Sequence, residues 1–110
     1  MMNLNYFNTL FPNQPEIIET VIDLTISEFP QFKRDVKRCV KKVDKVGLKK
    51  LAHKWQYTAK ILGINEVWNN LDAFRECEKL GERRIKQLTT SVITQLEVVV
   101  DKLHELRVSA

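Results

Sequence analysis

Apolar side chains recur at alternating spacings of three and four residues in two long stretches of the chain. An α-helix repeats every 3.6 residues, so this spacing places them on one stripe of a helix. The first stripe comprises Ile18, Ile22, Thr25, Phe29, Phe32, Val36, Cys39 and Val43, and the second comprises Ile85, Leu88, Val92, Leu96, Val99, Leu103 and Leu106. Both stripes must be buried against other elements, and an all-α fold is therefore predicted.

Two further helices are predicted between these stretches. Asp44 is a candidate N-cap for a helix that ends near Gly63, where glycine can adopt the left-handed closing conformation. Asn65 is the expected N-cap of the next helix, which Gly81 closes and whose apolar face comprises Val67, Leu71, Phe74 and Cys77 or Glu78. The last helix is expected to span about residues 83–106. Short connections favour antiparallel neighbours, which predicts an up-down antiparallel four-helix bundle.

Residues 1–14 are expected to form a short N-terminal cap segment, and residues 15–108 the bundle. The segment carries apolar side chains that would pack over one end of the domain, namely Leu4, Tyr6, Phe7, Leu10 and Phe11. Asn13 and Pro15 then supply an N-cap and a first-turn proline. Pro30 interrupts the first apolar stripe without changing its phase, so two collinear or bent helical pieces are expected rather than a reversal.

The 110 residues are 44% hydrophobic, which suffices for one compact domain with one core. Cys39 and Cys77 belong to no metal or redox motif, so they are expected to be apolar core residues in a reducing compartment, and no metal site is predicted. The chain has neither a secretion signal nor a run of about 20 apolar residues. A cytoplasmic protein that does not span a membrane is expected.

Positive charge is concentrated in one part of the chain. Residues 33–54 carry ten Lys or Arg against two Asp, a net charge of +8, whereas the remainder carries −4. This basic surface could steer an anionic partner, or it could be an ordinary solvated helix face. A helical nucleic-acid binder is a further alternative. No recognition-helix motif or aromatic platform accompanies the charge, so no nucleic-acid partner is predicted.

The helix expected between Asp44 and Gly63 carries a histidine on its polar side. Its apolar stripe comprises Leu48, Leu51, Trp55, Thr58 and Leu62, and His53 lies nearly opposite that stripe. Lys49, Gln56 and Lys60 are expected on the same exposed face as His53. No structural role for His53 is evident from the sequence, which makes it the candidate functional residue. The other histidine, His104, is expected on the polar face of the last helix and is not a candidate.

The residues around His53 resemble the motif of histidine-containing phosphotransfer (HPt) domains, approximately A-H-x-L-K-G-[SA]-[AS]-x-x-[LI]-G. The matching residues are Ala52-His53, Thr58-Ala59 and Leu62-Gly63, with Asp44 at the capping position nine residues before the histidine. The stretch Glu28-Phe29-Pro30 is also similar to the first bundle helix of that family. The resemblance covers about residues 16–106 and implies the same four-helix bundle.

The resemblance implies a phosphorelay intermediate of two-component signalling. His53 would accept a phosphoryl group and pass it to or from an aspartate of a receiver domain. The expected partners are a response regulator receiver domain, a hybrid sensor histidine kinase, or both. The chain would carry phosphate without an ATP site or a cofactor of its own, because Mg²⁺ belongs to the receiver, and it would not be an enzyme in the usual sense. A monomer is expected.

Two residues depart from the family pattern. The family usually has lysine three residues after the histidine and glycine four residues after it, whereas this chain has Gln56 and Tyr57. Lys49 and Lys60 are expected to stabilise the phosphate, with Lys54 as a further substitute for the missing lysine and Gln56 offering a neutral hydrogen bond. Tyr57 would narrow the partner range or contact the partner. The alternative is a non-transferring adaptor that binds and sequesters a receiver domain or kinase.

Overall fold

The computed structural model describes residues 5–109, with the backbone alone for residues 107–109. The described chain is all-α, as predicted. Its elements are α1 (Asn5–Leu10), α2 (Pro15–Lys41), α3 (Lys45–Ile61), α4 (Asn65–Asp72), the 3-10 helix η1 (Ala73–Lys79) and α5 (Glu82–Ser109).

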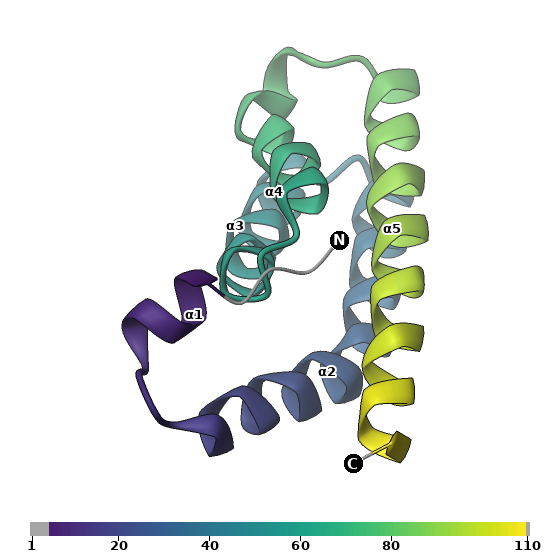
Figure 1. The fold of residues 1–110 in the computed structure, drawn as a ribbon. Helices are drawn as coiled ribbons and strands as arrows, with labels where there is room; N and C mark the ends of the chain where they lie inside the picture. The colour runs from purple at the N-terminus through teal and green to yellow at the C-terminus, as the bar shows by residue number, and fades with distance from the viewer. Residues whose placement is uncertain (1–4, 110) are drawn as a thin grey trace.

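Four helical segments run alternately up and down and form an antiparallel bundle (Figure 1). These segments are the second half of α2, then α3, then α4 with η1, and finally α5. α3 packs against α2 and against the α4–η1 unit, and α5 closes the ring by contacting α2 and α4. The prediction of a helical bundle with a short N-terminal segment is confirmed.

α2 is one helix of 27 residues with Pro30 in its interior. Proline has no amide hydrogen to donate to the carbonyl of Ile26, and its ring crowds the preceding turn, so helices bend at such positions. Figure 1 shows the consequence: the first half of α2 crosses the lower end of the bundle, and the second half turns upward beside α5. Of the two arrangements expected, the bent one is therefore observed.

α2 and α3 end in the same kind of turn. After α2 the amide of Asp44 donates to the carbonyl of Cys39 at 2.8 Å, and after α3 the amide of Ile64 makes the equivalent bond at 2.9 Å. The residue before each of these amides is left-handed, with a φ of 54° at Val43 and 66° at Gly63. Both turns are Schellman motifs. Gly63 closes α3 as predicted, whereas a β-branched valine holds the strained position after α2.

Asp44 caps α3 as predicted, because its Oδ1 accepts a hydrogen bond of 2.9 Å from the amide of Gly47. A Cβ atom at position 47 would lie 2.6 Å from the other carboxylate oxygen of Asp44 and 2.8 Å from Sγ of Cys39. Such distances are too short for non-bonded atoms. The absence of a side chain at Gly47 therefore lets the cap and the cysteine pack together.

Several predicted helix boundaries were wrong. Gln14 rather than Asn13 precedes α2, and Ile64 rather than Asn65 precedes α4; neither of these residues makes a side-chain capping bond. The third unit is not a single α-helix, because it tightens into η1 after Asp72. Gly81 lies in the connection that follows, and the last helix begins one residue earlier and ends three residues later than expected.

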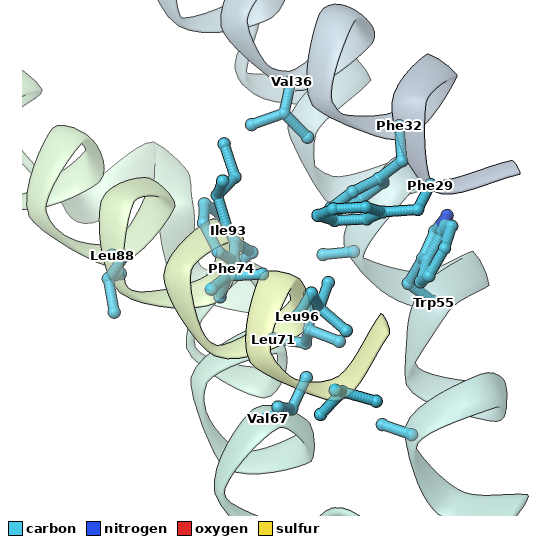
Figure 2. Close-up of a cluster of buried hydrophobic side chains, with 14 of the residues drawn as sticks. Phe29, Phe32, Val36, Trp55, Val67, Leu71, Phe74, Leu88, Ile93 and Leu96 are labelled. Atoms are coloured by element: carbon cyan, nitrogen blue, oxygen red, sulfur yellow. The ribbon is translucent and has the colours of Figure 1, made fainter. Parts of the chain in front are cut away.

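Aromatic side chains of α2 and α3 meet in the core. The rings of Phe29 and Phe32 lie 6.2 Å and 4.6 Å from the ring of Trp55, centroid to centroid, and side chains of the other bundle helices face this cluster (Figure 2). Cys39 and Cys77 are both buried and free, as predicted. The predicted stripes reach too far at two places, because Val43 is 48% exposed and Leu106 is 51% exposed.

α1 covers the end of α3. The ring of Phe7 is buried against Phe11, and the ring of Tyr6 lies under the ammonium group of Lys60, whose Nζ is 4.8 Å from the ring centroid. The part of the predicted cap segment that the structure describes thus packs over one end of the bundle. Leu4 was also expected to pack there and lies outside the described residues.

Candidate functional site

His53 lies in the middle of α3 and is exposed to solvent. Its neighbours on the helix, Ala52 and Trp55, are buried in the core, with exposed fractions of 5% and 4%. Those contacts fix the rotation of α3 about its axis, so the imidazole is presented outward from a helix that packed neighbours hold in place. The predicted orientation of His53 is therefore observed.

The buried face of α3 differs slightly from the predicted stripe. Its buried residues are Leu48, Ala52, Trp55, Gln56 and Ala59, followed by Leu62 at the C-cap, whereas Leu51 and Thr58 are half-buried. The centre of the buried face is thus rotated toward α4 and η1. The rotation brings Gln56 into the interface, and the assignment of Gln56 to the exposed face was wrong.

Gln56 is 9% exposed, and its amide nitrogen donates a hydrogen bond of 3.2 Å to Oδ1 of Asp72, the last residue of α4. The same oxygen accepts a bond of 3.3 Å from Arg75. The side chain of Gln56 is therefore engaged between two helices and does not point at solvent beside His53. Its predicted role as a neutral hydrogen bond to phosphate does not fit this geometry.

Tyr57 stands beside His53 on the exposed face of α3. Its side chain is 63% exposed, and the two rings meet edge to face with centroids 5.6 Å apart. Any group that approaches the imidazole from this side must contact the tyrosine ring. The ring of Tyr57 is therefore accessible, and its contact with a partner stays a prediction.

Lys49 lies one turn before His53 but is bound to another element. Its Nζ is 2.8 Å from Oε1 of Glu78 in η1. This hydrogen bond raises the pKa of the Lys49 ammonium and lowers the pKa of the Glu78 carboxyl, as expected for a pair in which each charge favours the other. The predicted cation is thus near His53 but is held by a carboxylate.

Lys60 lies two turns after His53, and its ammonium group is over the ring of Tyr6 in α1. Seven residues of α-helix span about 10 Å along the axis, so the backbone of Lys60 lies about 10 Å from that of His53. The prediction that Lys60 lies on the face of His53 holds. Its ammonium group nevertheless points toward the N-terminal segment.

Lys50 and Lys54 are two further cations near His53, of which Lys54 was predicted as a substitute for the missing lysine and Lys50 was not singled out. Both are exposed, and neither forms an ion pair with any residue that the structure describes. Lys50 lies three residues before His53, which places the two side chains on adjacent positions of the helix surface. The i−3 spacing was visible in the sequence, but the lack of an acidic partner was not.

The part of the chain described by the structure contains no group of three His, Cys, Asp or Glu side chains arranged to hold a metal ion. Comparison of the chain with protein-family models, with curated proteins and with solved structures found no match. Among the described helices, none combines the length and the apolar character that crossing a bilayer requires.

Proposed function

We propose that this protein is a phosphorelay intermediate in which His53 reversibly carries a phosphoryl group. The single observation behind the proposal is an exposed imidazole on a helix that a four-helix bundle holds rigidly, surrounded by lysines. In the rest of the relay, the partners are a receiver domain and a hybrid sensor histidine kinase. The two free thiols are in keeping with a reducing, cytoplasmic setting.

The proposed step is an in-line displacement at phosphorus. The unprotonated ring nitrogen of His53 attacks the aspartyl phosphate of a receiver, a P–N bond forms, and the P–O bond to the aspartyl carboxyl oxygen breaks. The departing carboxylate keeps the electron pair of that bond. The hydrogen on the other ring nitrogen stays there, giving a phosphorylated imidazolium that can lose this proton to water. The reverse step returns the phosphoryl group to a carboxylate.

Such transfer needs positioning and neutralisation of the phosphoryl oxygens more than it needs covalent chemistry from the protein. The receiver supplies its acidic pocket and Mg²⁺. This chain supplies the nucleophile and the positive charge of nearby lysines, of which Lys50 and Lys54 have no acidic partner among the described residues. No ATP site on this chain is required, and the protein acts as a carrier.

The second candidate function is a non-transferring adaptor of the same architecture. Two observations favour it: Gln56 is engaged by Asp72 where the family has a lysine, and the ring of Tyr57 abuts His53 where the family has a glycine. In this alternative the exposed face of α3 still binds a receiver or kinase. His53 then accepts no phosphate, and the bound partner is sequestered.

Phosphorylation with a small-molecule donor separates the two functions. The purified protein is incubated with phosphoramidate, whose P–N bond breaks with departure of ammonia as the new P–N bond to His53 forms. Intact mass is then measured before and after mild acid treatment. The relay proposal expects one acid-labile phosphoryl adduct on the wild type and on His104→Gln, and none on His53→Gln.

His104→Gln is the matched control, because His104 is also exposed and also lies on a bundle helix. A conventional HPt domain treated in parallel confirms that the donor is active. If that domain gains phosphate and this protein does not, the relay proposal is wrong. Binding of receiver domains to His53→Gln then tests the adaptor, which predicts undiminished affinity.

A further inference from the structure

Lys49 lies four residues before His53, and its side chain is restrained by an ion pair with another element of the bundle. Lys49 and His53 are four residues apart, so their side chains are neighbours on the surface of α3. The ammonium group of Lys49 is nevertheless committed to Glu78, at 2.8 Å, across the interface between α3 and η1. Both side chains of this pair remain partly exposed, with fractions of 40% and 52%, and can exchange partners with little rearrangement.

Glu78 is held in place by bonds that do not involve its carboxylate. Nζ of Lys45 donates to the carbonyl oxygens of Glu78 and Leu80 at 3.4 Å and 3.1 Å. Sγ of Cys77, which is fully buried, donates to the carbonyl oxygen of Lys45 at 3.2 Å. The end of η1 is thus attached to the first turn of α3, and the Glu78 carboxylate is kept beside Lys49.

We infer that Glu78 restrains Lys49 in the resting protein, and that Lys49 exchanges Glu78 for the phosphoryl group when His53 becomes phosphorylated. The inference rests on the proposed relay function. Glu78 acts only through Lys49 and is a positioning residue, whereas Lys49 contacts the phosphoryl oxygens. A phosphoryl group carries up to two negative charges and three acceptor oxygens, so it competes effectively with one exposed carboxylate.

The other candidate cations are placed less suitably for such an exchange. Arg75 is bound to Asp72, a carboxylate that also accepts a hydrogen bond from the buried Gln56. Lys60 is directed to Tyr6. Lys50 has no acidic partner among the described residues, so its contribution is constant rather than regulated.

The test compares initial rates of phosphorylation by phosphoramidate in five variants and the wild type. Glu78→Gln frees Lys49 and is expected to raise the rate several-fold. Lys49→Met removes the cation and is expected to lower the rate by about tenfold, less than the loss of a buried oxyanion donor would cause, because this site is exposed. The double variant Lys49→Met/Glu78→Gln is expected to match Lys49→Met alone.

Glu76→Gln is the matched control for the loss of an acidic side chain from η1. Glu76 pairs with Lys79 within η1, at 3.1 Å, and its replacement is expected to leave the rate unchanged. Glu78→Gln and Lys49→Met break the same ion pair, so a merely structural role for the pair would change both phosphorylation rates in the same direction. A rate that rises in one variant and falls in the other therefore excludes that role. Lys49→Arg keeps the positive charge and is expected to retain most of the wild-type rate.

The possible failures are distinguishable. If the wild type and Glu78→Gln both gain no phosphate on His53, the relay function itself is wrong, and this inference with it. If His53 is phosphorylated at the same rate in the wild type, in Glu78→Gln and in Lys49→Met, then Glu78 and Lys49 have no part in the reaction. The relay function still stands in that case. If the phosphorylation rate falls in both single variants, the Lys49–Glu78 pair contributes to the stability of the fold and not to the reaction.

Discussion

The side-chain amide of Gln56 in α3 lies 3.2 Å from the carboxylate of Asp72 at the end of α4. The third residue after the exposed histidine therefore belongs to a helix–helix interface. Because Gln56 is 9% exposed, its polar atoms depend on protein partners more than on water. The bond contributes to how α4 sits against the helix that carries His53.

Replacing Asp72 by Ala is expected to destabilise the protein by about 1–3 kcal/mol, because it leaves the nearly buried amide of Gln56 without its acceptor. Gln56→Leu removes the demand for that acceptor and is expected to cost less. Urea unfolding followed by circular dichroism measures both values. The reverse order of stability would contradict this account. Gln56→Leu is also expected to leave the phosphorylation rate of His53 unchanged.

Replacing Tyr57 by Gly or by Ala is expected to change the rate of phosphoryl transfer to receiver domains, or the choice among them, because the tyrosine ring borders the imidazole. The glycine variant also carries a helix-propensity cost of about 1 kcal/mol, which the alanine variant avoids. Agreement between the two variants would therefore assign the effect to the ring. Unchanged transfer to every receiver tested would remove Tyr57 from the docking surface.

Val43→Gly is expected to stabilise the protein by about 1 kcal/mol, since relief of a left-handed β-branched residue outweighs the added freedom of the unfolded chain. Gly63→Ala places a side chain at the equivalent left-handed position after α3 and is expected to cost about 1–2 kcal/mol. Thermal unfolding of the two variants should thus shift in opposite directions. A loss of stability in Val43→Gly would show that the half-exposed valine side chain contributes more by packing than its backbone strain costs.

The two thiols are expected to resist alkylation in the folded protein. Burial is the largest cause that raises the pKa of Cys39, followed by the nearby Asp44, and burial also raises the pKa of Cys77. At about pH 8.5 each thiol is then less ionised in the folded chain than in the unfolded chain. Iodoacetamide labelling followed by intact mass should be slow in buffer and complete in denaturant.

The raised pKa values of the two thiols also make the stability of the protein depend on pH. A thiol whose pKa is raised by folding stabilises the native state fully below its ordinary pKa, and this contribution is lost as the pH rises through the raised value. The free energy of unfolding is therefore expected to fall as the pH rises above 9.0, the ordinary thiol pKa for these two residues. Cys39→Ala/Cys77→Ala should show a smaller decline over the same range.

Periodicity was sufficient to predict the long helices of this chain, because each of them buries one stripe and the stripe repeats with the helical turn. It predicted neither the short helix α1 nor η1. The Asp44 cap and the Gly63 closure were also predictable, since each depends on a local bond or a local backbone angle. The Asn13 and Asn65 caps were wrong because Asn13 lies two residues before α2 in a left-handed conformation, with a φ of 61°, and because Asn65 is already the first residue of α4. The tightening of α4 into η1 has no local signal that we recognise in the sequence.

The site was harder to predict than the helices. A helical wheel places Gln56 near His53, but it cannot show that α4 covers that side of α3. The position of Glu78 is equally invisible, because Lys49 and Glu78 are 29 residues apart and meet only when η1 docks on α3. Exposure of His53 followed from its position opposite the stripe. The partners of the surrounding lysines depended on tertiary packing.

The bend at Pro30 also divides α2 in its resistance to local unfolding. Of the five buried residues of this helix, four lie at or after position 29, and Thr25 alone precedes it. Amides whose surroundings carry few buried contacts open more often and exchange hydrogen for deuterium faster. Exchange is therefore expected to be rapid over residues 15–24 and slow over residues 32–41. One continuous helix would then behave as two units that open independently.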